Sequence, residues 1–304
     1  MKLADKAGLV LSRLAEADRR FVVLDGDLAD SDGAEHFAKQ HPDRFLMAGI
    51  AEQGMVSVAA GMATTGLRPW VFSFAAFLCY RAYDQVRVCL SQTNLPVVLV
   101  GSHAGGLAGR NGKTHAAHND LALMLSLPNM HVWAPADFPD VETAIVESAK
   151  QVGPSYIRMP RRQFRESENL PGEAALLRWI RPRQKLTIVS TGLGTHWAVA
   201  VADRLTMSGV EVGLLHCLRL KPVCALAEQL QGVDQLVTIE DHYCFGGLAS
   251  VVAQHCPTTP LTCFGWPSDF TGKSGADDDL RKQCGLADLN ITSQILRERQ
   301  RRNG

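Results

Sequence analysis

The sequence has little of what marks a disulfide-bonded, zinc-binding or membrane-spanning protein. Its eight cysteines are scattered, with no CxxC pair and no cysteine and histidine spacing of a zinc site. A reduced, cytoplasmic protein is therefore expected. No apolar run is long enough to span a bilayer, and the polar start MKLADKAG has no apolar secretory core.

An excess of charge of one sign is also missing. Lys and Arg together number 31, as do Asp and Glu, so neither nucleic acid nor a membrane surface is an expected partner. What is there is an ordinary globular composition, 46% hydrophobic and 20% charged over 304 residues. That length is sufficient for two domains with sizeable cores.

Short β-branched runs alternate with helix-like stretches through the first half of the chain. The helix-like stretches end at Gly66, cover 81–91, and begin again near Asp137, an expected N-cap. Such alternation predicts a mostly parallel sheet covered on both faces. The predicted strands are 21–25, 70–74, 96–101, 130–134 and 155–159.

The pattern breaks after this first set. Residues 162–184 are polar and charged without a clean period, and we predict a linker at 169–184. A second alternating set follows, so the predicted fold is two α/β domains in series, 1–168 and 185–304. Its predicted strands are 186–190, 210–216, 235–240 and 260–265.

Glu52 lies where a strand is predicted to meet a small, apolar helix, in the segment GIAEQGM. A carboxyl at such a junction should be buried, and burial favours its protonated form. Phe74, Phe77 and Tyr80 follow in the pattern FxxFxxY. With the carboxyl they can form a slot for a flat, basic heterocycle. The alternatives are a helix N-terminal carboxylate and ordinary core aromatics.

The loop GSHAGGLAGRNGKTHAAHND, residues 101–120, is the second candidate site. It follows a predicted strand directly, at the sheet edge where open α/β folds bind ligands. It can be a mobile surface loop. Alternatively, its glycines let the backbone approach a small polar substrate, with His103 and His115 as donors or proton shuttles.

Several separated motifs together resemble one family. GIAEQ, FAAFLCYRAYDQVR, the GKTH loop, SLPNMHVWAPAD and PSYIRMPR are similar to the pyrimidine-binding domain of the transketolase family of thiamine diphosphate enzymes. VTIEDHYCFGG and GWPSDFTGKSG resemble that family's carboxy-terminal domain. The motifs occur in the family's order over nearly the whole chain. GIAEQ and RAYDQV also resemble the deoxyxylulose-phosphate synthase branch.

The resemblance implies which residues contact the cofactor. Glu52 matches the glutamate that hydrogen-bonds the aminopyrimidine and thereby activates the thiazolium carbon, for which a proton-sharing carboxyl is needed. The aromatic residues match a pocket in which stacking orients the pyrimidine. The full set implied for the cofactor is Asp27, Ile50, Glu52, Phe74, Phe77 and Tyr80.

The resemblance also implies a substrate site. His103 and His115 match histidines that contact a donor ketose and assist proton transfer. The other implied substrate residues are Ser31 and Arg161 for a phosphate, Arg81 as in the synthase branch, and Asn111. Two positions depart from the family pattern. Asn111 stands for an aspartate that bonds substrate hydroxyls, and Ala4 stands for an arginine of the phosphate cluster.

The resemblance further implies a partner. The family holds the cofactor's diphosphate through a metal ion in a separate domain marked by a GDG motif and a following asparagine. Here the nearest match, at 25–27, has no such continuation. Thiamine diphosphate and Mg²⁺ are therefore expected to be completed by a separate amino-terminal transketolase-type subunit, in an α2β2 heterotetramer. Helix 53–65, rich in small residues, is the candidate interface.

Three functions remain open. The preferred one is transfer of a two-carbon ketol unit between small-molecule sugars, which His103 and His115 favour. The second is the β subunit of a 2-oxo acid dehydrogenase complex, which would decarboxylate a 2-oxo acid instead. The third is a non-catalytic regulatory or assembly partner. Asn111, in place of the family's aspartate, is compatible with this third function.

Overall fold

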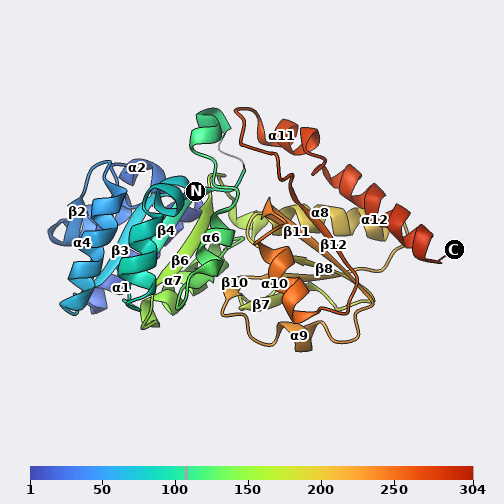
Figure 1. Ribbon diagram of the computed structural model, residues 1–304, viewed down its shortest axis with the longest axis horizontal. Helices are drawn as coiled ribbons and strands as arrows, with labels where there is room; N and C mark the ends of the chain where they lie inside the picture. Colours follow the sequence, from blue (N-terminus) through green and yellow to red (C-terminus); the bar gives the residue numbers. More distant parts are fainter. Residues whose placement is uncertain (107–108, 304) are drawn as a thin grey trace.

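The computed structural model of the chain describes residues 1–106 and 109–303. Two α/β domains follow one another, each built on its own sheet (Figure 1). The predicted fold class is therefore confirmed. The amino terminus lies near the junction of the domains, and helix α12 (Asp288–Asn303) ends the chain at the far side of the second one. No helix in the described ranges is long and apolar enough to cross a membrane.

The first sheet has seven strands in the order β10-β5-β6-β4-β3-β1-β2. All neighbours pair in parallel except β10, which comes from the second half of the chain and pairs antiparallel with β5. The strands predicted in the first half are all present. Their bounds are β1 Phe21–Asp25, β2 Phe45–Met47, β3 Arg68–Phe74, β4 Val98–Ala104, β5 His131–Trp133, β6 Ser155–Pro160 and β10 Arg219–Lys221.

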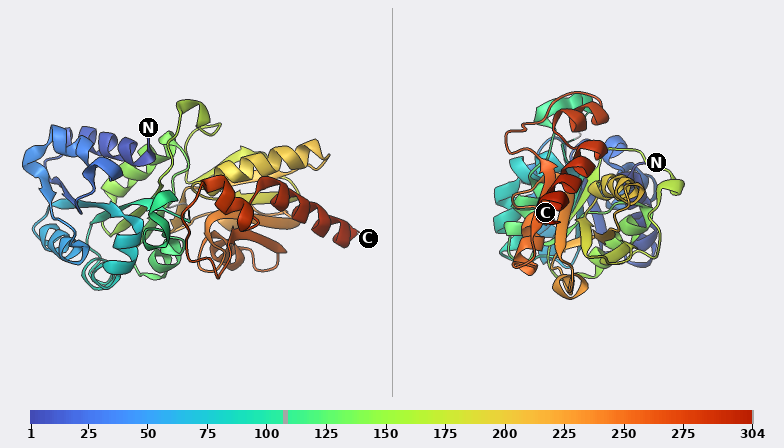
Figure 2. Two further views of the ribbon diagram at one scale, coloured as in Figure 1. Left: turned by 90° about the horizontal axis from the view of Figure 1, so that it is seen from above. Right: turned by 90° about the vertical axis from the view of Figure 1, so that its right-hand side faces the viewer.

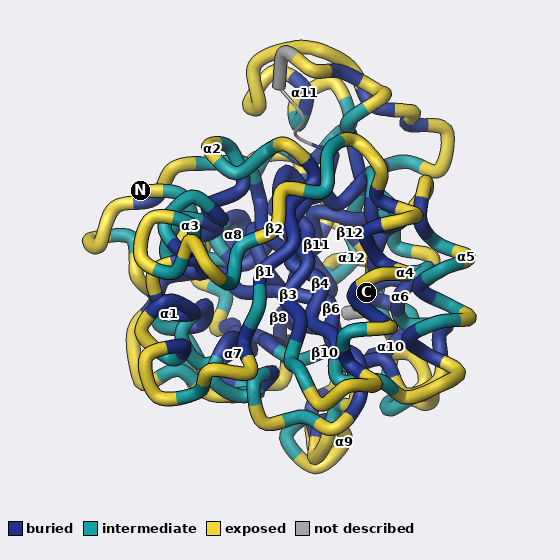
Figure 3. Tube along the Cα trace, turned by 90° about the vertical axis from the view of Figure 1, so that its left-hand side faces the viewer, coloured by how far each residue is buried: buried dark blue, intermediate teal, exposed yellow. Residues whose placement is uncertain are grey.

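Helices cover both faces of this sheet, as Figure 3 shows by the buried strands between two helical layers. Helices α1 (Leu3–Ala17), α3 (Glu35–Gln40) and α7 (Phe138–Lys150) pack together on one face. The other face carries α4 (Glu52–Thr64), α6 (Asp120–Ser126) and a helical segment, interrupted at Ala82, that covers the predicted helix 81–91. That segment consists of π-helical Phe77–Arg81, α5 Tyr83–Gln85 and π-helical Val86–Ser91.

Short local elements complete the first domain. Helix α2 (Ala29–Asp32) follows β1, and a 3₁₀ turn, Pro42–Arg44, precedes β2. The predicted N-cap of α7 is confirmed, because the Asp137 carboxylate accepts a hydrogen bond from the Asp140 N–H at 2.9 Å.

The second sheet has five strands in the order β12-β11-β8-β9-β7. Helices α8 and α12 pack against each other beside it (Figure 2). Strands β8, β9, β11 and β12 correspond to the predicted set. The bounds are β7 Leu177–Arg181, β8 Leu186–Ser190, α8 Gly194–Met207, β9 Gly213–Cys217, α9 Leu226–Gln229, β11 Gln235–Tyr243, α10 Leu248–His255, β12 Leu261–Trp266 and α11 Asp277–Gln283.

Strand β7 lies inside the stretch predicted as a linker, so that prediction is wrong for residues 177–181. The strand pairs antiparallel with β9. Its charged Arg178 is only 3% exposed, because it donates to the buried carboxylates of Asp137 at 3.0 Å and Asp140 at 2.9 Å. A buried, paired arginine hides the alternation by which a strand is recognised in sequence.

A buried ionic network joins the two domains. Arg158 of β6 pairs with Asp120 of α6 at 2.9 Å and donates to the Asp241 carbonyl of β11 at 2.6 Å. The Asp241 carboxylate accepts from the Gly106 N–H at 3.0 Å and from the Trp266 indole at 2.7 Å. Contacts of this kind across the junction hold the carboxyl edge of the first sheet against the second domain.

Candidate functional site

Glu52 is the first residue of α4 and is fully buried. Its Oε1 accepts a hydrogen bond from Ser73 Oγ at 3.1 Å, and its Oε2 lies 2.5 Å from Arg81 Nη1. The predicted burial at the strand-to-helix junction is confirmed. Ser73, on β3, had no signal in the sequence beyond its place one residue before Phe74.

Phe74 and Phe77 form the floor of the site. Their rings stack with centroids 5.6 Å apart and an interplanar angle of 20°. The Arg81 guanidinium lies 4.4 Å from the Phe77 centroid, a cation–π contact, while it also holds Glu52. Phe77 and Arg81 bound a π-helical turn, a geometry frequently found at functional sites.

Tyr80 does not join this stack among the ring contacts of the described residues. It is 42% exposed, and its hydroxyl donates to the Asn119 side chain. The pattern FxxFxxY predicted that all three aromatics line one slot with the carboxyl. The structure differs because Phe74 ends a strand whereas Tyr80 belongs to a π-helical turn, so no single period relates them.

His103 also stacks on Phe74, with ring centroids 3.9 Å apart. It lies near the end of β4 with a positive φ of 54°, and its Nδ1 is 3.1 Å from Ser102 Oγ. Burial, followed by the positive charge of Arg161, lowers the pKa of His103 to about 3. Its imidazole is therefore neutral near pH 7.

His115 completes the aromatic cluster. Its ring centroid lies 5.9 Å from Phe74 and 5.2 Å from Phe77, both edge-on. Its Nδ1 is 2.8 Å from Thr114 Oγ1. The structure thus brings both predicted histidines to the predicted phenylalanines. Asn111 is exposed in the segment Gly109–Thr114 that leads to His115.

The loop after β1 passes directly beside Glu52. A Cβ added to Gly26 would lie 3.3 Å from Glu52 Oε1 and 3.1 Å from Ser73 Oγ, closer than side chains ordinarily approach. The next residue, Asp27, is exposed with a positive φ of 70°. Ser31 is half-buried in α2, which follows this loop.

A lysine that the sequence analysis missed lies near this loop. Ala4, which stands where the family pattern has an arginine, is 2% exposed inside α1. Lys2 instead donates from Nζ to the Ser31 carbonyl at 2.9 Å. The positive charge of Lys2, like that of Arg161, lowers the pKa of His103. Lys2, two positions before Ala4, therefore places a cation next to Ser31.

Ile50 lies apart from the cluster on the surface between β2 and α4. It is 73% exposed and belongs to a group of exposed apolar side chains. We call this group the α4 patch: Leu46, Met47, Ile50 and Val58. The polar and small residues Gln53, Gly54, Ser57 and Gly61 of α4 are exposed beside it.

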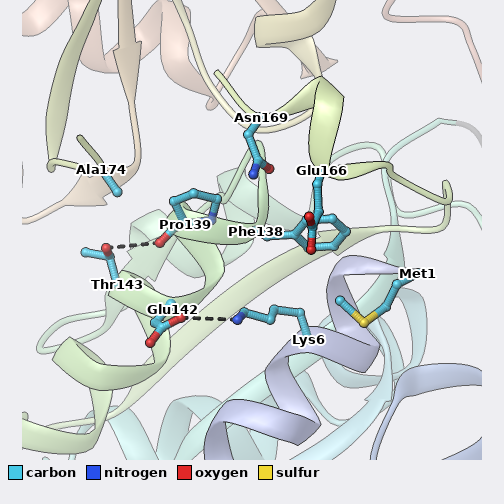
Figure 4. Close-up of a pocket in the computed structure, with 9 residues that line it drawn as sticks. All are labelled: Met1, Lys6, Phe138, Pro139, Glu142, Thr143, Glu166, Asn169 and Ala174. Atoms are coloured by element: carbon cyan, nitrogen blue, oxygen red, sulfur yellow. Dashed lines mark hydrogen bonds and ion pairs between the residues drawn. The ribbon is translucent and has the colours of Figure 1, made fainter. Parts of the chain in front are cut away.

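One cavity of the surface lies away from this cluster. It measures about 400 Å³ and opens between α1, α7 and the segment near Glu166 (Figure 4). Lys6 and Glu142 in its wall already pair with each other at 3.1 Å. None of the candidate site residues lines it. In the described ranges no group of three or more His, Cys, Asp or Glu side chains could hold a metal ion.

Comparison with known families identifies the fold that carries this cluster. The model of the transketolase pyrimidine-binding domain matches residues 1–167. The chain belongs to the transketolase family. The model of the transketolase C-terminal domain matches residues 175–291, so both halves resemble the family in the order that the motifs predicted.

The transketolase relatives fall into two length classes. A putative transketolase C-terminal section of Methanocaldococcus jannaschii is 34% identical over 96% of this chain and 94% of its own length. The 6-deoxy-6-sulfo-D-fructose transketolase subunit SqwH of Clostridium sp. is 33% identical over 97% and 93%. This chain spans only about half the length of other curated transketolase relatives.

A solved structure agrees with the shorter class. It is described as a split gene transketolase, inactive beta4 tetramer, and it matches with a TM-score of 0.86 at 30% identity. The match covers 98% of this chain and 97% of that one. In extent and fold this chain thus corresponds to the C-terminal section of a transketolase.

Proposed function

We propose that this chain is the subunit of a split transketolase that binds the pyrimidine half of thiamine diphosphate. The complex would transfer a two-carbon ketol unit from a ketose to an aldehyde acceptor. The observation that carries the proposal is the fully buried Glu52 carboxyl beside the stacked Phe74 and Phe77 rings, with His103 and His115 on the same cluster.

The residues present fit an aminopyrimidine. Glu52 is buried, yet one of its two hydrogen-bond partners, Arg81, has a side chain that is 40% exposed. Turning Arg81 towards solvent would free Oε2 for a ring nitrogen and uncover the face of Phe77. Gly26 leaves the space beside Oε1 empty of a side chain. When bound, thiamine diphosphate would supply the carbon nucleophile of the reaction.

Glu52 would hold a shared proton at the ring nitrogen, where general acid–base assistance needs it. Ser73 would keep its other oxygen in place. Phe74 and Phe77 would orient the ring by stacking. A second candidate for orientation, Tyr80, has its hydroxyl on Asn119 and would act from the rim of the site.

The two histidines would serve the substrate. His103, held neutral by burial, would donate or accept a hydrogen bond at a sugar hydroxyl without adding charge. His115 would assist proton transfer. Asn111 would offer an amide that both donates and accepts where the family pattern has a carboxylate.

An anionic group on the sugar would bind near the loop after β1. Arg161 and Ser31 are the predicted phosphate residues, and Lys2 adds a second cation next to Ser31. The name of the Clostridium relative specifies a sulfo sugar, which also carries an anionic end. We therefore propose an anionic ketose as donor, with the phosphate ester as the first compound to test.

The other half of the cofactor would be held by a partner. The proposed partner is an amino-terminal transketolase-type subunit that binds the diphosphate and Mg²⁺, in an α2β2 heterotetramer. The α4 patch and the small residues of α4 would face it. Asp27 would lie near the cofactor at this boundary.

All eight cysteines are free thiols, which fits the proposed cytoplasmic location.

The test is to co-express the chain with such a partner and assay ketol transfer from a ketose phosphate in thiamine diphosphate and Mg²⁺. Transfer by the complex, with none by either chain alone, is the expected result. Consumption of a 2-oxo acid only would identify a dehydrogenase β subunit instead. A complex that binds cofactor without any turnover would identify a non-catalytic partner. The two transketolase relatives that match this chain over nearly all of their own length favour ketol transfer.

A further inference from the structure

Two buried carboxyl groups close the loop that lies beside Glu52. Asp25 is the last residue of β1, and Asp32 is the last residue of α2. Both are 0% exposed. Neither belongs to the residues proposed above for cofactor or substrate, although the loop between them carries Asp27 and Ser31.

Each carboxyl uses one oxygen for the backbone. Asp25 Oδ1 accepts from the Leu28 N–H at 2.8 Å, and Asp32 Oδ1 accepts from the Ala34 N–H at 3.1 Å. The two Oδ2 atoms are buried and receive no hydrogen bond from the N–H and O–H groups of the described residues. Both residues meet at Leu28, whose N–H donates to Asp25 and whose carbonyl accepts from the Asp32 N–H, so the charge of Asp25 acts on Asp32.

Two acceptors that face each other without a donor require a proton between them. The alternative, two buried carboxylate anions in contact, is strongly unfavourable. Burial raises the pKa of both Asp25 and Asp32, and the Asp25 charge raises that of Asp32 further. The positive charge of Lys2 lowers the pKa of Asp32, and the negative charge of Asp27 raises the pKa of Asp25. Glu52 lies across Gly26 from the pair.

The pair ties together the two ends of a functional loop. The turn between them is held by Ser31 N–H and Asp32 N–H, which both donate to the Leu28 carbonyl at 2.7 and 2.9 Å. The residue after the pair, Gly33, is pressed against the Ala4 backbone of α1, where an added Cβ would lie 2.2 Å from the Ala4 carbonyl oxygen. One end of the loop is therefore fixed by α1 and the other by the sheet.

We propose that Asp25 and Asp32 share a single proton, and that this proton fixes the segment 26–31, the loop after β1 and the first residues of α2, beside Glu52. Asp32 is the proton-carrying, positioning residue, and it donates to the Asp25 carboxylate. The loop presents Asp27 and Ser31 to the ligands, a consequence that rests on the proposed function. Loss of the proton at alkaline pH would set two anions against each other and release the loop.

Asp32→Asn separates this role from simple packing. The asparagine amide keeps the shape of a protonated aspartate, accepts from Ala34, and donates a proton that does not titrate. Asp32→Ala removes the bridge at every pH. Asp43→Asn, an exposed acid paired at 3.5 Å with the exposed Arg19, is the matched control for loss of one carboxylate.

The first measurement is hydrogen exchange of the full chain from pH 5 to pH 10, expressed as protection factors for the amides of 28–34. In the wild type and in Asp43→Asn, protection should fall about tenfold per pH unit once the shared proton is lost, because each unit lowers the bridged population tenfold. Asp32→Asn should keep its protection over the same range. Asp32→Ala should show low protection throughout.

Equal pH profiles of protection for the wild type and Asp32→Asn would overturn the shared proton.

The second measurement is kcat and KM of the complex with the partner subunit. Asp32→Asn should keep the wild-type kcat and extend activity to higher pH, and Asp32→Ala should lose activity. Absence of ketol transfer in the wild-type complex would instead refute the proposed function, and leave the exchange result untouched.

Discussion

Two arginines of the first domain, Arg158 and Arg81, pair with buried carboxylates and differ in their own exposure. At the domain junction, Arg158 is 3% exposed and both of its carboxylate partners, Asp120 and Asp241, are fully buried. At the candidate site, Glu52 is equally buried, but the side chain of Arg81 is 40% exposed. The junction network is closed, whereas the Glu52 pair is open on one side.

The difference indicates what each pair can do. In the closed network both carboxylates contact buried partners, as when Asp120 also accepts from the Tyr156 hydroxyl at 2.7 Å. It can only hold the two domains in place. An open pair can exchange its arginine for a ligand, because water solvates the released guanidinium. A buried acid with a replaceable partner is therefore the more reactive of the two arrangements.

The largest expected effect comes from breaking the closed network. Arg158→Met leaves two buried carboxylates without their cation, and the free energy of unfolding should fall by about 3 to 5 kcal/mol. Chemical denaturation of the purified chain measures this. Arg87→Met, which removes an exposed ion pair with Asp84, is the control and should change stability by less than about 1 kcal/mol. Similar losses in both variants would contradict the contrast.

The open pair should respond in activity instead. Glu52→Gln keeps the volume and a hydrogen-bonding oxygen, so assembly with the partner and the unfolding midpoint should change little. Ketol transfer by the complex should fall about 10²-fold or more, because the shared proton is lost. Glu16→Gln, on the exposed surface of α1, is the control. Near-normal turnover in Glu52→Gln would show that the glutamate assignment is mistaken.

The cluster around Phe74 should be weakened by acid. The pKa of His103 in the folded chain is about 3, below its ordinary value of 6.5, so the unfolded chain binds the extra proton first. The contribution of neutral His103 to the free energy of unfolding is therefore complete above pH 6.5 and decreases as the pH falls towards 3. At pH 5 the loss should be about 2 kcal/mol.

Thermal unfolding between pH 4 and 8 tests this expectation. His103→Asn, which tolerates the positive φ, should have a flatter profile than the wild type over the acid range. His36→Asn on α3 is the control for loss of one imidazole. Parallel profiles in all three proteins would mean that His103 is not held neutral by its surroundings.

The smallest effect is expected from Ser73→Ala. The variant removes one hydrogen bond to Glu52 Oε1, which contributes about 1 kcal/mol. Activity of the complex should fall about fivefold, by less than in Glu52→Gln. Ser208→Ala, an exposed serine after α8, should have no effect. A loss of activity as large as that of Glu52→Gln would indicate that Glu52 shares its proton with Ser73 rather than with the ring nitrogen.

Local patterns determined much of the fold from the sequence alone. The β-branched runs predicted the parallel strands of both sheets, and Asp137 predicted the start of α7, because strands and caps depend on neighbouring residues. The junction at Glu52 predicted its burial in the same way. The motifs predicted the family, which the match over both domains confirmed.

Tertiary contacts decided what no local pattern carried. Strand β7 was missed because Arg178 is buried only through carboxylates on α7, and Lys2 was missed because its place beside Ser31 is set by the packing of α1. The same holds for the Asp25 and Asp32 pair, whose meeting depends on a turn pressed against α1. Charges become buried, shared or replaceable only when distant segments remove water from around them.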